Sequence, residues 1–360
     1  PTQARARVNQ ILDNCISYQS YQASAGNNYG VAGFLYHFIT ANGTRQGACE
    51  VSTIDMALFL AGAITAGEYF GGEVKTKAAQ IYNSMNWAYF LNTSKQQFSH
   101  GWFQDSGVMP ATWDRPSDET MLVSLLAIGA NPNNPDMLKT MYSWPRTVRD
   151  YKGIKVVNSY FGSLFTYLFA HCFFDFEKLG MDNPAYAGSA NTPVNWWVNS
   201  VNAANANRQF CIDNAVNYDS YGENSWGITI CEYPSGQYSD FLGAAPCESN
   251  FAIPYHNGTI APYGAISSMP LLRTSSSETL DANPAFRALK YYYQTYYHHL
   301  WGEYGPKDSF NHNKEFSSAY LGIDVGPQVI MIENYRSGLL WKSFMKNEKV
   351  IAAVNKVFGD

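Results

Sequence analysis

The sequence predicts an all-α protein, a toroid or barrel built from helical hairpins. Three observations lead to this fold class: apolar residues recur at helical spacing along most of the 360-residue chain, convincing β signals are few, and no repeat of fixed length is present. The missing repeat argues against a simple solenoid, so a barrel of hairpins fits better. Because no long linker rich in Ser, Gly and Pro divides the chain, we expect a single domain over residues 1–360.

The expected helices follow one another with long loops between them. The first, at 5–24, ends in a stretch of Ser, Gly and Asn. Segments 52–70 and 75–91 are separated by Gly71 and Gly72 and predict a helical hairpin. Short segments compatible with either a strand or a helix end are 155–158, 228–231 and 328–331. Further helices are expected at 118–128, 135–149, 161–179, 195–207, 283–297, 328–345 and 348–358.

The composition favours a carbohydrate partner. Aromatic residues make up 16% of the chain, with 26 Tyr, 21 Phe and 9 Trp, whereas charged residues make up only 15%. Many rings can fill a helical core, but Tyr and Trp also combine a flat apolar face with a hydrogen-bonding edge, which suits sugar rings. The net charge of −5 and the absence of Lys or Arg runs exclude an electrostatic nucleic-acid footprint and argue against polyanionic substrates.

Other classes of site have weak support. No stretch approaches the roughly 18 to 20 apolar residues of a membrane span. The seven His residues show no His-Glu-x-x-His arrangement and no Gly-rich phosphate loop is present, so we expect neither a metal nor a nucleotide cofactor. The six Cys residues contain no Cys-x-x-Cys pair, which leaves buried thiols and disulfides equally open.

Carboxylates occur beside Trp and Gly in several loops, and glycoside hydrolysis needs one carboxylic acid and a second carboxylate facing one cleft. In the segment from Trp113 to Glu119, Glu119 is the candidate acid, although Ser117 could instead cap a helix whose first turn carries the acidic pair. In the loop from Trp301 to Asn311, Asp308 is the first candidate for the base.

A third loop, followed by a helix, carries Asp324 and Glu333. The structural alternative is strong here, since Asp324 could cap the helix and Glu333 could pair with Arg336. Glu50 and Asp55, near Arg45, pose the same choice between substrate contact and buried pairing. The candidate sugar contacts of all these loops are Glu50, Asp55, Trp102, Trp113, Arg115, Trp226, Trp301, Phe310 and Glu333.

Several stretches of the chain resemble the glucoamylase-like family that contains the bacterial endo-β-1,2-glucanases. They occur in one order from about residue 30 to residue 345, which makes them more specific than any single motif. The stretches are Glu50-Val-Ser-Thr-Ile-Asp-Met-Ala-Leu-Phe-Leu-Ala-Gly-Ala, Asp118-Glu119-Thr-Met-Leu, Asn224-Ser-Trp-Gly, Gly258-Thr-Ile-Ala-Pro, Leu300-Trp-Gly-Glu-Tyr-Gly, Gly322-Ile-Asp-Val-Gly-Pro and Glu333-Asn-Tyr-Arg.

The resemblance implies an (α/α)6 barrel, a secreted or periplasmic location and hydrolysis of β-1,2-glucan by an inverting mechanism without a cofactor. It implies that Glu119 is the acid and Asp308 the base, with Asp324 as the alternative base. We also expect a monomer. Inversion predicts carboxyl groups about 6.5 to 9.5 Å apart, whereas retention requires about 5 to 5.5 Å.

The chain departs from the family pattern at Asp118, at Gly305-Pro306 and in the stretch beginning at Cys172. These departures leave the linkage, the chain length and the choice between endo and exo action open. The alternatives to an endo-glucanase are a transglycosylase, an exo-acting enzyme that releases a disaccharide, and a carbohydrate-binding protein without catalysis. A polysaccharide lyase is disfavoured because the chain is acidic and its Arg residues are not clustered.

Overall fold

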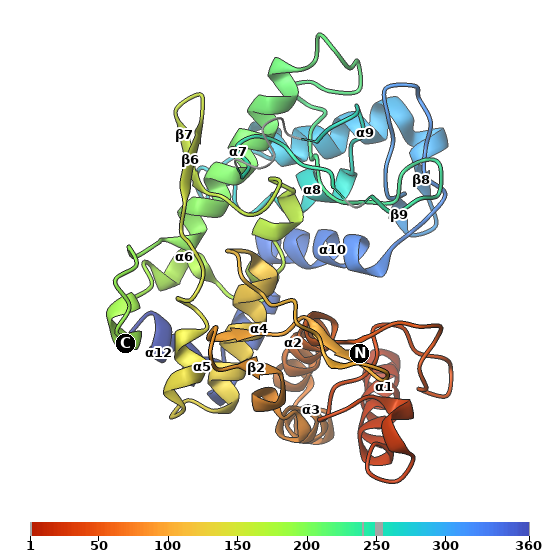
Figure 1. The fold of residues 1–360 in the computed structure, drawn as a ribbon. Helices are drawn as coiled ribbons and strands as arrows, with labels where there is room; N and C mark the ends of the chain where they lie inside the picture. The colour runs from red at the N-terminus through yellow and green to blue at the C-terminus, as the bar shows by residue number, and fades with distance from the viewer. Residues whose placement is uncertain (1, 240, 249–254, 360) are drawn as a thin grey trace.

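The computed structural model describes residues 2–239, 241–248 and 255–359, and helices are its main elements, as the sequence predicted (Figure 1). The α-helices are α1 (Thr2–Tyr21), α2 (Thr53–Phe70), α3 (Gly72–Ser84), α4 (Asp118–Ala130), α5 (Pro135–Lys139), α6 (Phe176–Leu179), α7 (Trp196–Asp213), α8 (Pro262–Ser267), α9 (Pro284–Leu300), α10 (Gly322–Ser337), α11 (Leu339–Phe344) and α12 (Glu348–Val357).

Short antiparallel strands decorate the helices. The order of the three-stranded sheet is β1-β4-β5, with Val51 opposite Trp102, and the remaining strands form the pairs β2–β3, β6–β7 and β8–β9. Their bounds are β1 (Val51–Ser52), β2 (Leu91–Asn92), β3 (Gln97–Phe98), β4 (Gly101–Phe103), β5 (Gly107–Val108), β6 (Val148–Tyr151), β7 (Ile154–Val157), β8 (Trp301–Gly302) and β9 (Gly305–Pro306).

Side-chain caps set where the helices that matter for the site begin. Ser52 accepts a hydrogen bond from the backbone N–H of Asp55 at 3.3 Å, and Ser117 accepts one from Thr120 at 3.2 Å. A capping oxygen satisfies one of the backbone donors that the first turn leaves unpaired. The caps therefore fix Asp55 in the first turn of α2 and Glu119 in the first turn of α4.

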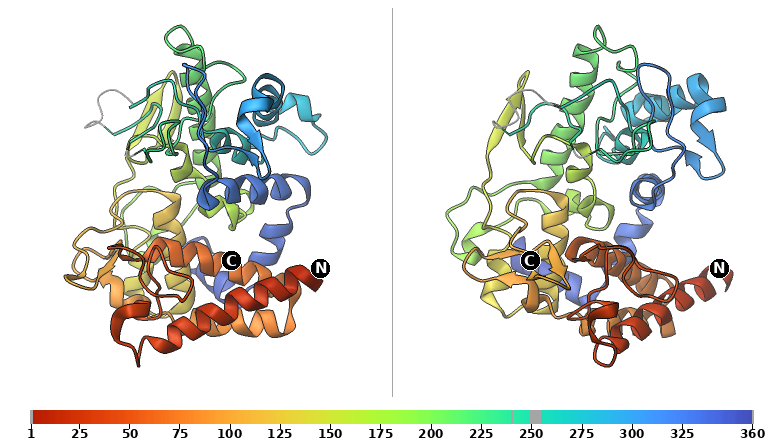
Figure 2. Two further views of the ribbon diagram at one scale, coloured as in Figure 1. Left: turned by 90° about the vertical axis from the view of Figure 1, so that its right-hand side faces the viewer. Right: turned by 45° about the vertical axis from the view of Figure 1, so that its right-hand side comes forward.

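Two hydrophobic cores organise the molecule. The first core packs α1–α5, α11 and α12 together, and we call this part the lower lobe; the second packs α7, α8 and α9 together, and we call it the upper lobe. Figure 1 shows α10 between the two lobes, and the two further views in Figure 2 agree. Each core contains large buried aromatic rings, including Trp87 and Trp144 below and Trp226 and Tyr292 above.

Three expected helices are different in the structure. Residues 161–179 do not form one helix but the 3₁₀ turns Leu164–Tyr167 and Ala170–Cys172 followed by α6. Expected helix 135–149 ends at α5, and expected helix 328–345 begins earlier, at Gly322, and breaks at Gly338, whose φ of 66° is left-handed. Helix α8 was not predicted.

The structure also bears on two points raised by the composition, namely the state of the Cys residues and the presence of membrane-spanning helices. Cys15, Cys172, Cys211 and Cys231 are buried and free, so the structure places thiols rather than disulfides at these positions. Among the residues that the structure describes, none of the helices combines the length and the apolar character that crossing a membrane would require.

Candidate active site

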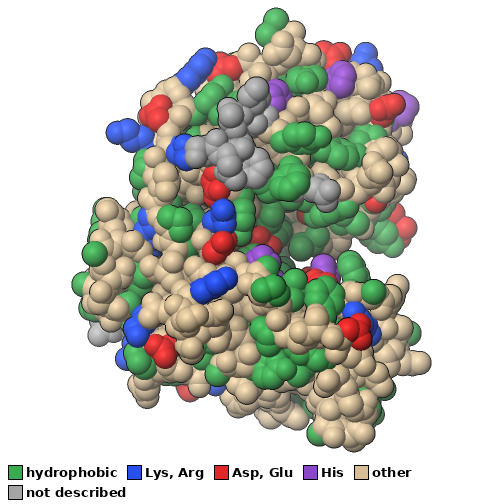
Figure 3. All heavy atoms as spheres, viewed as in Figure 1, with side chains coloured by type: hydrophobic (Ala, Val, Ile, Leu, Met, Phe, Trp, Pro, Cys, Tyr) green, Lys and Arg blue, Asp and Glu red, His purple; other side chains and the backbone are tan. Residues whose placement is uncertain are grey.

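The face of the molecule in Figure 3 is hollowed between the lower and upper lobes, and acidic and His side chains gather around the hollow. Glu119 comes from α4 below, whereas Asp308 follows β9 above and Asp324 lies in the first turn of α10. Burial raises the pKa of the Tyr238 phenol, and the charges of Asp324, Asp308, Cys231 and Glu119 add to the rise. All three candidate catalytic carboxyls therefore lie within electrostatic reach of one phenol.

Glu119 is held in surroundings that favour its neutral form. The side chain keeps a partly exposed edge, and no residue that the structure describes donates a hydrogen bond to its carboxyl group. Burial raises the pKa of Glu119 to about 8, and the negative charges of Asp55 and Asp118 contribute. A carboxyl group with this pKa keeps its proton at pH 7 and can donate it as a general acid.

The preceding residue, Asp118, has a structural role. Its Oδ2 accepts hydrogen bonds from the backbone N–H of Ala170 at 2.9 Å and of His171 at 3.1 Å, and lies 2.7 Å from His171 Nδ1. Asp118 is 1% exposed and His171 is 0% exposed. The departure from the family pattern at this position thus ties α4 to the turn at 170–172.

Asp308 and Asp324 form the opposite wall. Asp308 is 3% exposed and its Oδ2 accepts a hydrogen bond from the backbone N–H of Glu232 at 2.6 Å. Asp324 is 1% exposed, and the two Asp side chains lie within hydrogen-bonding distance of each other. Burial raises the pKa of both groups, and the charge of Asp308 raises that of Asp324 further.

Glu50 and Asp55 are joined by His37 rather than by Arg45. His37 Nδ1 lies 2.9 Å from Glu50 Oε1, and His37 Nε2 lies 3.7 Å from Asp55 Oδ2. Arg45 instead donates to the backbone carbonyl of Cys49 at 2.7 Å. Asp55 acts on Glu119 electrostatically, so this cluster belongs to the lower wall.

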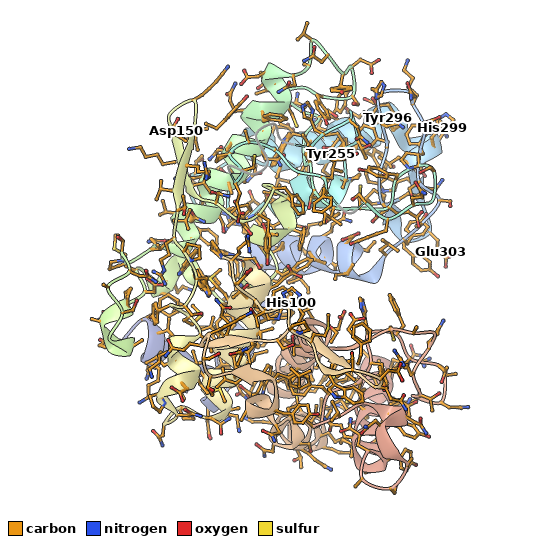
Figure 4. The ribbon with its side chains drawn as sticks, viewed as in Figure 1. His100, Asp150, Tyr255, Tyr296, His299 and Glu303 are labelled. Carbon is orange, nitrogen blue, oxygen red and sulfur yellow. The ribbon has the colours of Figure 1, made fainter. Side chains whose placement is uncertain are left out.

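Sequence reasoning missed His100, which Figure 4 shows beside the gap between the lobes. The imidazole packs on Trp113, with ring centroids 4.2 Å apart. Burial lowers the pKa of His100, and its Nε2 is buried without a hydrogen-bond partner in the part of the chain that the structure describes. Its position two residues before Trp102, which was already a candidate sugar contact, was the available signal.

Arg115 borders a cavity of about 340 Å³. Its guanidinium lies 2.6 Å from Asp114 and 2.8 Å from Glu248 and stands over the Tyr160 ring at 5.5 Å. Burial raises the pKa of Tyr160, as does the charge of Glu119, which places the cavity near the acid. Residues that line the cavity include Asp114, Arg115, Pro116, Arg149, Asn158 and Glu248.

Four predicted ring contacts require correction. Trp226 and Phe310 are 0% exposed in the upper core, and Trp102 is 5% exposed. Trp113 is 8% exposed and donates from Nε1 to Thr53 Oγ1 at 3.0 Å. Because these four side chains are buried, we withdraw the prediction that they contact a sugar.

The last two predicted contacts lie at the edge of the site or away from it. Trp301 is half-buried, with its ring centroid 5.3 Å from that of Tyr293. Glu333 pairs with Arg336 at 3.0 Å and accepts a hydrogen bond from Ser337 at 2.6 Å, near the end of α10 remote from Asp324. The structure therefore places Glu333 in the intrahelical pairing that was its alternative role.

The chemistry available is that of carboxylates. Within residues 2–239, 241–248 and 255–359, no group of three or more His, Cys, Asp or Glu side chains could hold a metal ion. One wall offers a carboxyl group that retains its proton, and the other offers a hydrogen-bonded carboxylate. Such a pair of unlike carboxyls suits acid and base catalysis at neutral pH.

Comparison with known families and proteins gives concordant matches. The model of the Glycoamylase family, described as "Putative glucoamylase", matches residues 112–348. A curated Parabacteroides distasonis protein named "Exo beta-1,2-glucooligosaccharide sophorohydrolase (non-reducing end)" is 27% identical over 332 residues, covering 84% of this chain and 43% of that protein. The chain thus spans less than half the length of this relative.

Solved structures share the fold. An endo-β-1,2-glucanase from Chitinophaga pinensis, in complex with sophorotriose and glucose, aligns with a TM-score of 0.78 at 22% identity, covering 99% of this chain and 81% of its own. A β-1,2-glucanase from Parabacteroides distasonis aligns with a TM-score of 0.77 at 22% identity, covering 98% of this chain and 51% of its own.

Proposed function

The chain belongs to the Glycoamylase family, and from this premise we propose that it is a glycoside hydrolase that cleaves β-1,2-linked glucan. The resemblance that the sequence motifs predicted is confirmed by the family match. The observation that carries the proposal is the contrast between Glu119, whose pKa is raised to about 8, and Asp308, which accepts a backbone hydrogen bond. The names of the relatives support the choice of linkage.

In the proposed reaction, Glu119 donates its proton to the glycosidic oxygen as the bond to the anomeric carbon breaks. A water on the other face of the sugar attacks that carbon and gives a proton to Asp308. The products have inverted anomeric configuration, and this geometry requires carboxyl groups about 6.5 to 9.5 Å apart. The cluster of His37, Glu50 and Asp55, together with Arg115 and Trp301, supplies hydroxyl and ring contacts to neighbouring glucose units.

The architecture and setting are part of the same proposal. The packing of α2 on α3 and of α8 on α9 and α10 supports a ring of helical hairpins, which we interpret as one domain with an (α/α)6 barrel. We further propose that the protein acts as a monomer outside the cytoplasm.

The direct test is incubation with linear β-1,2-glucan and, in parallel, with β-1,3-, β-1,4- and α-1,4-glucans. Chromatography of the products and NMR of the fresh anomeric centre report linkage and stereochemistry. The expected result is short β-1,2-linked products of α configuration that disappear in Glu119→Gln. Binding of glucan without any turnover would indicate a carbohydrate-binding protein instead of an enzyme. Products longer than the substrate would indicate transglycosylation.

An exo-acting enzyme is the second candidate, and one observation favours it. The ion pair between Arg115 and Glu248 ties together two loops that are 133 residues apart, beside the candidate acid. A tie at this position would block a long glucan from running past Glu119. Disaccharide as the sole early product, replaced by mixed lengths in Arg115→Ala, would establish exo action, whereas mixed lengths from the unaltered protein would exclude it.

A further inference from the structure

The carboxyl groups of Asp308 and Asp324 each carry one buried oxygen without a partner among the described residues, namely Asp308 Oδ1 and Asp324 Oδ2. The other oxygen of Asp308 accepts the Glu232 N–H at 2.6 Å. Carboxylate oxygens can only accept hydrogen bonds, so two ionised groups in contact would leave both oxygens unsatisfied. A proton on one of the two carboxyl groups makes that group a hydrogen-bond donor to the other.

The charges around the pair point the same way. The titratable groups that face it are Glu232, Cys231 and Tyr238 from the loop at 231–239, and Tyr263 from α8. None of these groups is cationic. Across the residues that the structure describes, the ion pairs formed by Lys, Arg and His reach neither Asp308 nor Asp324. Two buried negative charges in contact without a compensating cation are strongly disfavoured.

The two carboxyl groups differ in what can stabilise a negative charge. Asp308 has the backbone N–H of Glu232. Asp324 faces the hydroxyl of Tyr263, which works to lower the pKa of Asp324, but this hydroxyl has a single proton and donates it to the carbonyl of Ile230 at 2.7 Å. A hydrogen bond from an amide favours the ionised form of its acceptor. The negative charge therefore belongs on Asp308 and the proton on Asp324.

We propose that Asp308 and Asp324 share a single proton at neutral pH, and that Asp324 is a positioning residue whose O–H orients the ionised Asp308 carboxylate. The role of Asp308 as the base rests on the function proposed above, but the shared proton does not. With Oδ2 held by Glu232 and Oδ1 held by Asp324, the plane of the carboxylate is fixed. Its remaining lone pairs then point in a constant direction toward the attacking water.

Replacement by Asn tests the proposal because an amide N–H can donate to Asp308 where the protonated Asp324 does. We expect Asp324→Asn to keep kcat within about threefold of the unaltered enzyme and to leave the acidic limb of its pH profile in place. We expect Asp324→Ala to lose the hydrogen bond, so that the acidic limb moves to higher pH by about one unit and kcat falls about tenfold. Asp308→Asn should lose about 10²-fold or more.

The proposal would be overturned if Asp324→Asn were as inactive as Asp308→Asn while its melting temperature was unaltered. Asp324 would then have to ionise for activity. Asp105→Asn serves as the matched control, since this side chain is 89% exposed. Its kinetics should be unaltered.

Infrared spectroscopy in D2O gives a readout that does not depend on hydrolysis. At neutral pH the unaltered protein should show the carbonyl stretch of a protonated carboxylic acid that Asp324→Asn lacks. A separate band of this kind should disappear in Glu119→Gln. Identical carboxylic-acid bands in the unaltered protein and Asp324→Asn would overturn the shared proton even if glucan cleavage is observed, and the expected difference would support it even if no glucan is cleaved.

Discussion

The two walls of the hollow hold their carboxyl groups in contrasting ways. Glu119 in the lower wall lies near the negative charge of Asp55 and receives no hydrogen bond from the described residues, whereas Asp308 in the upper wall is also buried yet accepts a backbone N–H. Burial raises both pKa values, so burial alone cannot distinguish an acid from a base. The difference shows that the donors around each group assign the roles.

Removing either catalytic carboxyl should have the largest effect. We expect Glu119→Gln and Asp308→Asn each to reduce kcat/KM about 10²- to 10⁴-fold. The double variant should be little worse than either single one, because acid and base act on the same transition state. Steady-state hydrolysis of β-1,2-glucan measures all three. Multiplicative losses in the double variant would show that the walls act independently.

Asp118, next to the acid, should affect stability instead. Asp118→Ala leaves three donors from Ala170 and His171 without their acceptor inside the protein. We expect the free energy of unfolding to fall by about 3 kcal/mol, as for other broken buried pairs. Urea unfolding followed by circular dichroism measures the loss, and Asp105→Ala should change it little. A stable but inactive Asp118→Ala would instead assign this residue a part in the chemistry.

The pH dependence should distinguish the walls. The active form requires protonated Glu119, so activity should fall as pH rises through its pKa of about 8. Asp55 raises this pKa because its negative charge disfavours a second one nearby. Asp55→Asn should therefore move the alkaline limb of kcat/KM to lower pH, by about half a unit, and leave the acidic limb in place. An unchanged alkaline limb would show that Asp55 does not influence the pKa of Glu119.

The smallest effect is expected at the rim. Trp301 is half-buried and packs edge-on against Tyr293 in the upper lobe. Trp301→Ala should raise KM about fivefold and leave kcat unchanged, since stacking binds the ground state and the transition state alike. Tyr69→Ala, at an exposed position on α2, is the control. Equal effects of the two substitutions on KM would show that Trp301 does not contact the substrate.

The sequence predicted the fold best where apolar spacing and capping residues agree. The expected helices 52–70, 283–297 and 348–358 correspond closely to α2, α9 and α12. It failed at 161–179, where aromatic residues fill a core as short turns whose N–H groups are satisfied by Asp118, an acceptor remote in sequence. The hairpin β6–β7 was predicted only in part: segment 155–158, compatible with a strand or a helix end, overlaps β7, but β6 was missed. Lys152 and Gly153 turn the chain with positive φ values, and no Asn-Gly signal is present.

For the site, residue type pointed to Glu119, Asp308 and Asp324, which all act on the Tyr238 phenol, but also to Glu333, which pairs with Arg336 instead. Residue type did not predict which rings are buried. Trp226 and Phe310 occur in polar loops, yet their rings turn into the upper core, since a large ring gains more from burial than from solvent. The contact between Asp308 and Asp324, and the bridge from Glu50 to Asp55 through His37, depend on how separate loops pack. No local pattern in the sequence contains that information.

The buried thiols provide a separate chemical probe of opening for each lobe. Cys15 and Cys172 lie in the first core, and Cys211 and Cys231 lie in the second. A thiol-specific reagent reaches such a side chain only when the surrounding structure opens, so labelling rates read by peptide mass spectrometry report the opening of each lobe separately. A single labelling rate for all four thiols would mean that the lobes open as one cooperative unit. Two different rates would mean that the cleft lies between parts that open independently.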